Sequence, residues 1–323
     1  MKVSVLLVTW NSAPHIQRCL DLLEKQTYLN FEVIIVDNGS IDGSLDRIQE
    51  KYPKLHIRVN ELGKNTGFTV ANNIGAQMAR GEWLVLLNAD AFPDPDWLEN
   101  LVEAAEKYPN ACFSSRQIQA NNPEYLDGEG DMYRAIGFAK RINYNVPVYP
   151  PEKEFVEIFS PCAAAALYPR QAFLDVGGFD EDFFSYYEDV DLGFRLRLHG
   201  LEAYYLSSAV VHHVGSASTG KMSDFSVYYS HRNLVWTYLK NMPSLLFWIY
   251  LPVHLVINLF FLVAHHFSDH WLTSQRTVVW RSKKDAILSF PKMWKKRRYI
   301  QKKRKASLKK VYRAMKKRIF VRY

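Results

Sequence analysis

The stretch Trp83–Asp90, which reads WLVLLNAD, decides the fold. Its apolar run lies between Gly81 and Pro93 and predicts a buried strand. The run stops abruptly at one carboxylate, Asp90, and a turn rich in Pro and Asp follows. Ligands of open α/β sheets bind in the crevice outside the carboxyl ends of the strands. Asp90 is therefore a candidate ligand-binding residue, and a strand that simply ends in a polar turn is the alternative.

Strand and helix patterns alternate in the part of the chain that leads to this stretch. Apolar runs predict strands at 3–9, 31–36 and 55–59, and helical spacing predicts helices through Ile16–Leu23 and Val70–Met78. This alternation is typical of the α/β class, here a doubly wound, mostly parallel sheet flanked by helices.

The second predicted strand also ends on an acid, Asp37, and a Gly-rich turn at 63–67 follows the third. Asp37 could accept hydrogen bonds from a base or ribose, and glycine turns let phosphates approach backbone amides. An Asx turn is the alternative for Asp37. The chain has neither GxGxxG after the first strand nor GxxxxGK[ST] anywhere, which disfavours a dinucleotide oxidoreductase and a P-loop NTPase.

Charge is divided between an acidic body and a basic tail. The 323 residues carry a net charge of +8, but residues 281–323 hold 19 Lys and Arg and a single acid. The remainder holds 22 basic and 32 acidic residues, so an anionic partner is expected for the tail. Three separated cysteines indicate neither a zinc site nor a disulfide framework. The apolar run at 3–8 is too short for a secretory signal peptide.

Residues 121–151 break the alternation with Gly, Asn, Pro and Tyr. Irregular stretches of this length are usually lids or binding loops. The aromatic side chains of this stretch suit stacking on sugar rings, and anchoring the loop to the body explains them at least as well. They are Tyr125, Tyr133, Phe138, Tyr144 and Tyr149.

A cluster of acids opens a helix that is predicted to end at Gly200. Ser185 and Glu188 fit a capping box. Asp189 and Asp191 favour a helix N-terminus electrostatically. Three acids within four residues exceed what capping requires, so the cluster is a candidate for chemistry.

Two histidines, His212 and His213, follow strand patterns at 204–206 and 210–211. A lone histidine is more often structural than a metal ligand. Arg232 lies on a predicted helix, where a diphosphate contact and a solvated helix face explain it about equally well.

Several motifs in this order resemble the GT-A nucleotide-sugar domain of family 2 glycosyltransferases. Among its branches, the chain is most similar to the rhamnosyltransferase-like one, which decorates bacterial polysaccharides. The resemblance covers roughly residues 1–240. The motifs are Val5–Asn11, Asp37–Ser40 with Asp42–Ser44, Asn65–Phe68 with Asn72–Asn73, and Leu86–Asp90.

The resemblance implies an inverting transfer from a nucleotide-diphosphate sugar, in which the pair Glu188 and Asp189 supplies the catalytic base, Asp189. It also implies a divalent ion on Asp90, a histidine and the donor diphosphate, and the spacing to the following glycine favours His212 over His213. Oxygen ligands suit Mg²⁺ or Mn²⁺, and an imidazole favours Mn²⁺. The residues implied in donor binding are Thr9, Trp10, Asn11, Asp37, Asn65, Gly67, Asn88, Asp90 and Arg232.

The chain departs from the family in two places. Many GT-A enzymes carry Asp-x-Asp where this chain has Asn88-Ala89-Asp90, so we expect a weaker metal site that the donor diphosphate completes. The Gln-x-x-Arg-Trp pentapeptide of processive members is absent, which implies transfer of one sugar at a time. The expected donor is a dTDP- or UDP-sugar of a deoxyhexose such as rhamnose, and the expected acceptor is a lipid-linked or polysaccharide glycan.

Residues 243–267 contain no Lys, Arg, Asp or Glu and are long enough to span a bilayer. Pro252, His254 and Asn258 lie near the middle, and a single crossing would separate the basic tail from the nucleotide-sugar domain. A kinked or re-entrant monotopic insertion at the cytoplasmic face of the membrane is therefore favoured over a span.

The tail carries an apolar stripe among Lys and Arg, a pattern typical of an interfacial helix on anionic lipid. The adjacent uncharged run favours membrane over nucleic acid as the partner. The predicted organisation is a GT-A domain at 1–240, a hydrophobic membrane-associated segment at 241–270 and a basic amphipathic tail at 271–323. The stripe consists of Leu308, Val311, Tyr312, Met315 and Ile319.

Two other functions remain as alternatives. A sugar-phosphate nucleotidyltransferase uses a similar sheet, but it needs a Gly-rich loop with Arg and Lys after the first strand, and Trp10-Asn11-Ser12 lacks one. A membrane-tethered protein that binds glycans or nucleic acid without catalysis is the other alternative.

Overall fold

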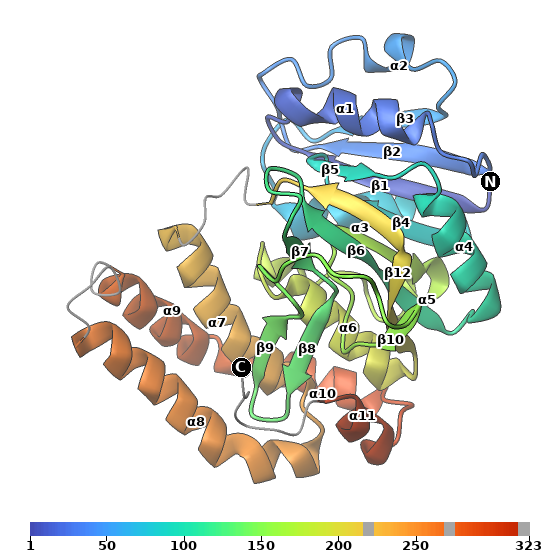
Figure 1. Ribbon diagram of the computed structural model, residues 1–323. Coiled ribbons are helices and arrows are strands. Elements are labelled where there is room, and N and C mark those ends of the chain that lie inside the picture. The colour runs from blue at the N-terminus through green and yellow to red at the C-terminus, as the bar shows by residue number, and fades with distance from the viewer. Residues whose placement is uncertain (216–222, 268–274, 316–323) are drawn as a thin grey trace.

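The computed structural model describes residues 1–215, 223–267 and 275–315 (Figure 1). Four neighbouring strands of its central sheet are parallel, as the sequence predicts. In sheet order they are β3 (Ile57–Glu61), β2 (Phe31–Asp37), β1 (Val3–Thr9) and β4 (Trp83–Leu87). The first five residues of the stretch Trp83–Asp90 therefore form a fully buried central strand.

The other half of the sheet is mixed. β11 (Ala165–Pro169) runs antiparallel to both β4 and β6 (Ala111–Gln119), so β6 points the same way as β4. β12 (Glu202–His213) is parallel to β6. Three short strands pair antiparallel at this side, namely β5 (Ala91–Pro93) and β10 (Phe155–Glu157) on β12, and β7 (Leu126–Gly128) on β6. The carboxyl ends of β1, β2, β4, β6 and β12 consequently lie at one edge.

Helices cover both faces of the sheet, which completes the predicted α/β fold (Figure 1). One hydrophobic core contains the apolar sides of α1 (Ala13–Leu23) and α4 (Trp97–Lys107), and a second contains those of α3 (Phe68–Met78), α5 (Arg170–Asp175) and α6 (Glu188–His199). The apolar spacing of these helices places their buried side chains on one side, against the pleated sheet. Two single-turn helices, α2 (Ile48–Lys51) and η1 (Glu181–Phe183), lie in connections.

The stretch 121–151 is more regular than its composition predicts. It contains β7 and a hairpin of β8 (Asp131–Arg134) and β9 (Phe138–Arg141). Tyr133 is fully buried and stacks on Phe159, so this aromatic side chain anchors the hairpin. Tyr144 is exposed and lines the cavity described below, where it remains a candidate for sugar stacking.

The C-terminal helices form a third core with the hairpin and α6. α8 (Ser244–Phe267) is one continuous helix that contains Pro252. Its segment Ser244–Ala264 has a mean hydropathy of 2.1 and is long enough to cross a membrane, by length and composition only. The other helices are α7 (Asp224–Asn241), α9 (Arg276–Leu288), α10 (Phe290–Lys302) and α11 (Leu308–Ala314).

The basic tail has a partner within the chain, which corrects its interpretation as a lipid-binding stripe. Val311 and Met315 are buried in the third core, so these two side chains do not face a membrane. Lys296 pairs with Asp180 and Asp182 of the acidic body. Part of the charge division in the sequence therefore stabilises the contact between tail and body. Ile319, the last residue of the predicted stripe, lies outside the described residues.

Candidate functional site

A cavity of about 360 Å³ opens at the edge where the carboxyl ends of the parallel strands meet. The β8–β9 hairpin and the start of α6 contribute to its wall. The lining is strongly polar for a cavity that lies next to the core. Its charged and amide side chains include Asn88, Asp127, Asp131, Lys140, Arg141, Glu188, Asp189 and His213.

Asp90 follows β4 directly and lies beside His213, the last residue of β12. Nε2 of His213 is 3.4 Å from Oδ1 of Asp90, and Nδ1 of the same ring is 2.8 Å from Oδ2 of Asp127. The assignment of His212 from the sequence is wrong. His212 lies on the other face of β12, where its Nε2 is 3.4 Å from Asp94, because successive side chains of a strand point to opposite faces.

The electrostatics of this pair follow from burial against two carboxylates. Burial lowers the pKa of His213, but the hydrogen bonds that its ring donates to Asp127 and Asp90 outweigh this effect and raise the pKa to about 9. Burial raises the pKa of Asp90, but the hydrogen bond and charge of His213 leave it below its usual value. An ionised carboxylate therefore faces an imidazole nitrogen at the end of the central strand.

The chemistry of this pair suits two coordination positions of a divalent ion, which is fewer than a complete site. Among residues 1–215, 223–267 and 275–315, no group of three His, Cys, Asp or Glu side chains is arranged to hold a metal. One carboxylate oxygen and one imidazole nitrogen suit Mn²⁺ or Mg²⁺, with the remaining positions left to oxygens of a ligand. Asn88, whose Nδ2 is 3.4 Å from His213 Nε2, borders the same position.

Glu188 and Asp189 form the first turn of α6 and are held there by a strained turn. Phe184, Tyr186 and Tyr187 all have positive φ values near 65°, a region that bulky residues rarely adopt. Tyr187 occupies the N-cap position, so the capping box expected for Ser185 and Glu188 is not formed. The strain places both carboxylates in the cavity wall.

Helix α7 stabilises this strained turn. Nδ2 of Asn233 donates to the carbonyls of Phe183, Ser185 and Tyr186 at 3.1, 2.9 and 2.7 Å. Nη2 of Arg232 donates to the carbonyls of Asp182 and Phe183, and its guanidinium carbon lies 4.0 Å from the Trp236 ring centroid. These bonds explain Arg232 as a support of the turn, because backbone carbonyls of irregular segments need donors. Contact of Arg232 with the diphosphate stays a prediction.

The buried acids of the cavity share a tendency to remain protonated. Burial raises the pKa of Asp189, although Arg141 and three backbone N–H groups act in the opposite direction. Burial, and then the charge of Asp189, raises the pKa of Asp131 to about 7 and that of Glu188 to about 8. Groups that titrate near neutral pH can exchange protons with a substrate.

Asp191, the third acid of the cluster, has a structural role. Its carboxylate pairs with Arg195 and with Lys240 of α7, at 2.8 Å in each case, and accepts from Asn241 at 2.7 Å. Its pKa is lowered because, although burial raises it, the charges of Arg195 and Lys240 outweigh this effect. Asp191 therefore joins α6 to α7 within the core.

The remaining donor-binding candidates lie in loops at the same sheet edge. Thr9 Oγ1 donates to Asp37 Oδ1 at 2.7 Å, and the backbone N–H groups of Gly39 and Ser40 donate to Asp37 Oδ2 at 2.9 Å. Both oxygens of Asp37 thus shape its turn, which is the Asx alternative. Contact of Asp37 with a base or ribose stays a prediction. Trp10 is 41% exposed at this edge and is available to a ligand.

Three further candidates shape neighbouring turns. Asn11 Oδ1 accepts from the backbone of Ile41 at 3.0 Å, and Asn65 Oδ1 accepts from the backbone of Gly67 at 2.9 Å. Gly67 starts α3 with a φ of +89°, and a Cβ there would lie 2.7 Å from the Phe184 ring. Its glycine therefore brings the third loop against the turn that leads to Glu188.

Sequence reasoning missed Asp127, Asp131 and Arg141. Asp131 and Arg141 are register partners across the β8–β9 hairpin, and Arg141 Nη1 lies 3.3 Å from Asp127 Oδ2. The signal in the sequence was the presence of three charged residues within the Gly-rich stretch 121–151. The apolar pattern of this stretch does not predict its strands, so it does not show where these residues lie. The hairpin brings them opposite α6.

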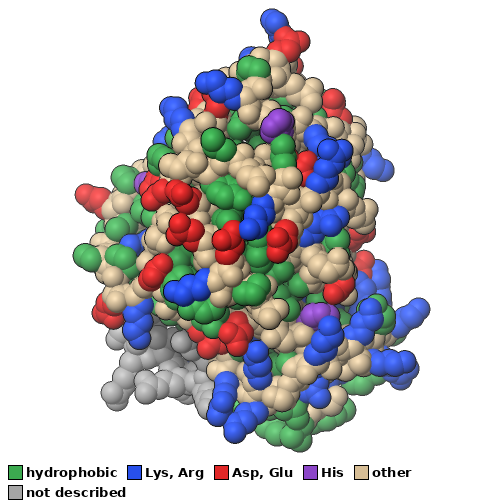
Figure 2. All heavy atoms as spheres, turned by 90° about the vertical axis from the view of Figure 1, so that its right-hand side faces the viewer, with side chains coloured by type: hydrophobic (Ala, Val, Ile, Leu, Met, Phe, Trp, Pro, Cys, Tyr) green, Lys and Arg blue, Asp and Glu red, His purple; other side chains and the backbone are tan. Residues whose placement is uncertain are grey.

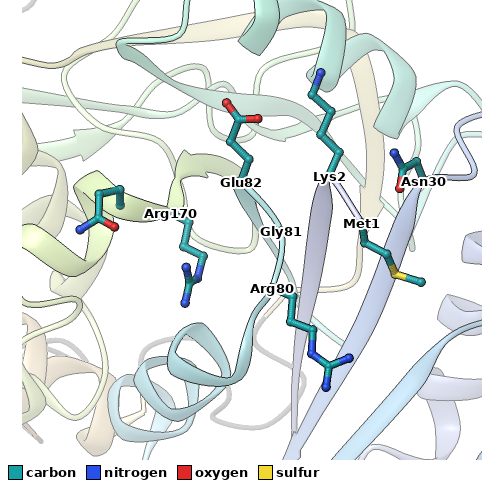
Figure 3. Close-up of a pocket in the computed structure, with 8 residues that line it drawn as sticks. Met1, Lys2, Asn30, Arg80, Gly81, Glu82 and Arg170 are labelled. Carbon is teal, nitrogen blue, oxygen red and sulfur yellow. The ribbon is translucent and has the colours of Figure 1, made fainter.

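A second hollow lies at the other end of the strands and carries no converging groups (Figure 3). It is lined by Lys2, Arg80, Glu82 and Arg170, among others. In Figure 3 the side chains of Arg80 and Arg170 extend to one side and those of Lys2 and Glu82 to the other. The carboxyl edge, where charged groups face one another, is the candidate site.

We expect Glu188→Gln to stabilise the protein increasingly as the pH rises. The unfolded glutamate ionises near its ordinary pKa of 4.5, whereas the folded group stays protonated to about pH 8, so the native state is penalised between these values. Glutamine removes the penalty. The melting temperature of the variant relative to wild type should therefore rise by several degrees between pH 5 and pH 8.

Glu202→Gln is the control for this measurement. Hydrogen bonds from Tyr204 and Lys310 lower the pKa of Glu202, so its ionised form stabilises the folded state above the ordinary pKa. Its replacement should have no stabilising effect at pH 8. An equal gain in both variants, or a pH-independent gain in Glu188→Gln, contradicts the raised pKa.

Comparisons with known proteins add to this geometry. The family model of Glycosyl transferase family 2 matches residues 4–176, more than half of the chain. N-acetylglucosaminyl-diphospho-decaprenol L-rhamnosyltransferase of Mycobacterium tuberculosis (strain CDC 1551 / Oshkosh) is 30% identical over 242 residues, which cover 67% of this chain and 77% of the relative.

Two solved structures share the GT-A fold. GalNAc-T7 with UDP, GalNAc and Mn²⁺ aligns with a TM-score of 0.63 at 16% identity, covering 93% of this chain and 57% of that one. The mannosyltransferase PcManGT from Pyrobaculum calidifontis, in complex with GDP-Man and Mn²⁺, aligns with a TM-score of 0.57 at 19% identity, covering 93% and 84%. At these identities the similarity concerns the fold.

Proposed function

The chain belongs to glycosyl transferase family 2, and from this premise we propose that it transfers rhamnose or another deoxyhexose from a dTDP- or UDP-sugar to a lipid-linked glycan. It is a glycosyltransferase by family. The sugar and acceptor are inferred from the M. tuberculosis relative, an L-rhamnosyltransferase whose name includes a diphospho-decaprenol lipid. Transfer of one sugar at a time with inversion completes the proposal.

One observation carries the proposal. His213, which lies beside Asp90, lines the same cavity as Glu188 and Asp189, although these residues come from distant parts of the sequence. A sugar transfer needs both functions together, a positive charge for the leaving diphosphate and a base for the acceptor. A Mg²⁺ or Mn²⁺ ion held by Asp90 and His213 would supply the first.

Asp189 supplies the second function. Its carboxylate accepts the proton of the acceptor hydroxyl while that oxygen attacks the anomeric carbon. The new C–O bond forms on the face opposite the bond to the diphosphate, which breaks, so the configuration inverts. Oδ1 accepts from the Val190 backbone at 2.8 Å, which orients the carboxylate, and the charge of Arg141 favours its ionised form. Asp131 and Glu188 surround it as further acids.

Release of nucleoside diphosphate tests this function. The full-length protein is incubated with Mn²⁺ and a panel of dTDP-, UDP- and GDP-sugars, after thermal stabilisation has ranked their binding. We expect dTDP-rhamnose or a UDP-sugar to release nucleoside diphosphate slowly by hydrolysis when incubated alone, and faster by sugar transfer when a polyprenyl-diphospho-sugar acceptor is present. A protein that only binds glycans or nucleic acid releases no nucleoside diphosphate, even where a ligand raises its melting temperature. This result would refute the proposed activity.

We also propose that α8 lies in the plane of the cytoplasmic membrane surface. Its polar side chains face the protein, since His254 Nδ1 lies 3.0 Å from the Ile136 carbonyl and Asn258 Oδ1 accepts from Lys283 at 2.6 Å. A crossing helix would expose Lys283, which is 5% exposed, to lipid or solvent. The opposite side is an apolar face at helical spacing, here called the lipid face. It comprises Leu245, Trp248, Ile249, Leu255, Val256, Leu259, Phe260 and Val263.

The surroundings of the lipid face support this orientation. Trp280, Ile287 and Leu288 of α9 and Phe290 of α10 are also exposed. In the lower part of Figure 2, where the C-terminal helices lie, Lys and Arg side chains gather beside hydrophobic ones. An exposed apolar patch rimmed by cations is typical of a surface that docks on anionic lipid.

The double substitution Leu255→Glu and Leu259→Glu should weaken binding to anionic phospholipid vesicles at least about 10-fold, because each buried leucine contributes about 1.5–3 kcal/mol. Vesicle co-sedimentation at low and high salt measures this effect. Leu29→Glu, at a residue 78% exposed between α1 and β2, is the matched control and should bind as wild type does. Equal binding by all three proteins would refute the lipid face.

A further inference from the structure

We propose that Asp127 is a positioning residue that aims His213 at the metal position beside Asp90. The inference rests on the proposed function, because the ion belongs to it. It concerns a residue outside the motifs that the chain shares with the family, and it follows from the contacts of the His213 ring.

The two ring nitrogens of His213 have different neighbours. Nδ1 is 2.8 Å from Asp127 Oδ2, and since a carboxylate oxygen accepts, Nδ1 carries the donated hydrogen. Nε2 is the nitrogen that faces Asp90 and Asn88, at 3.4 Å from each. Asp127 thus engages Nδ1 and leaves Nε2 as the nitrogen that would bind an ion beside Asp90. Histidines that bind metals almost always donate their other N–H in this way.

The sheet holds both partners in place. Asp127 lies on β7, which pairs with β6, and β6 pairs with β12, where His213 is the last residue. The side chains of Asp127 and His213 are only 9% and 7% exposed. Neighbouring strands fix the spacing of their side chains, so the contact is built into the backbone.

Arg141 holds the carboxylate from the other side. Its Nη1 lies 3.3 Å from Asp127 Oδ2, the oxygen that also accepts from His213. The neighbouring Gly128 leaves room for this contact, because a Cβ at Gly128 would lie 2.4 Å from the Arg141 side chain. Asp127, with cationic or donor groups on both sides, cannot turn away from the ring.

The chain offers its own control, the pair His212 and Asp94. It has the same chemistry at 3.4 Å, but the side chains are 34% and 41% exposed and lie on the other face of β12. Asp94 therefore contacts a histidine of the same strand, but neither His212 nor Asp94 lines the cavity.

The test measures metal binding directly. Free Mn²⁺ is titrated by electron paramagnetic resonance against full-length wild type, Asp127→Ala, Asp127→Asn and Asp94→Ala, each with saturating UDP and, separately, dTDP. Melting temperatures show that each variant is folded. We expect Mn²⁺ to bind about 10–100-fold more weakly to both Asp127 variants, the usual effect of removing such a partner, and within twofold of wild type to Asp94→Ala. Asp127→Glu should recover part of the affinity.

The outcomes separate this inference from the function on which it rests. If wild type binds Mn²⁺ and a folded Asp127→Asn protein binds it equally well, the positioning role is overturned while the metal site stands. If wild type binds no Mn²⁺ with either nucleotide, the metal site itself is overturned, and this inference with it.

Discussion

Asp189→Asn is expected to lower kcat at least about 100-fold, because a positioned general base contributes on the order of 10²–10⁴-fold to the rate. The amide has nearly the shape of the carboxylate but does not accept the proton of the acceptor hydroxyl. Steady-state transfer to a lipid-linked acceptor measures the loss.

Donor binding should be unchanged in this variant. Asp189 contacts the backbone of Val190 and Ala163 and has no contact with Asp90 or His213 among the hydrogen bonds and ion pairs of the described residues. We therefore expect the Kd for UDP or dTDP with Mn²⁺ to stay within twofold. The melting temperature should not fall, because burial raises the pKa of Asp189 and the amide removes a charge that is unfavourable there.

Two variants serve as controls for Asp189→Asn. Asp96→Asn, at an exposed residue before α4, should retain full turnover. Asp191→Asn, two residues along the same helix, should lower the melting temperature because it removes the carboxylate that pairs with Arg195 and Lys240. Near wild-type turnover in a folded Asp189→Asn protein would show that another residue is the base.

Asp90→Ala is expected to lower the rate of metal-dependent transfer about 10²–10³-fold. This is the range seen when an enzyme loses one group that stabilises the charge developing in the transition state. The reason is the departure from Asp-x-Asp. Asn88 offers no carboxylate, so Asp90 and His213 are the protein's share of the site, and a single histidine remains without Asp90. Transfer rates measured across a Mn²⁺ titration report the effect.

The pattern of loss distinguishes a metal ligand from a structural acid. Asp90→Ala should bind nucleoside diphosphate equally well with and without Mn²⁺, whereas wild type should bind it more tightly with Mn²⁺. Asp94→Ala, which removes the partner of His212 on the other face of β12, is the control and should keep its response to the ion. Metal-dependent transfer by Asp90→Ala at the wild-type rate would place the ion elsewhere.

The sequence predicted the parts of the site that depend on local order. Strands at 3–9 and 31–36 and the strand that begins at Trp83 are found within one or two residues of their predicted bounds, because a buried strand needs an apolar run and a turn to end it. Asp189 lines the cavity, and Asp90 lies beside His213, which also lines it. Their placement follows from their position at the end of a strand and the start of a helix.

The choice between His212 and His213 needed the tertiary structure. Adjacent residues of a strand point to opposite faces, and a shift of one residue exchanges them, so spacing to a glycine cannot decide which ring reaches Asp90. The surroundings of Arg232 also needed the tertiary structure. Its charge suits a phosphate, and only the strained turn before α6 shows that its Nη2 donates to two backbone carbonyls.

The sequence by itself determined the α/β fold, the family and two candidate acids, Asp90 after a strand and Asp189 at the start of a helix. These follow from periodicity and from motifs within a few residues. Only the tertiary structure decided that Asp127, Asp131 and Arg141 join the site, that the basic tail packs on the acidic body, and that the polar residues of α8 face inward. Each of these depends on contacts between residues far apart in the chain, where charge and burial are set by the partner and not by the neighbouring residues.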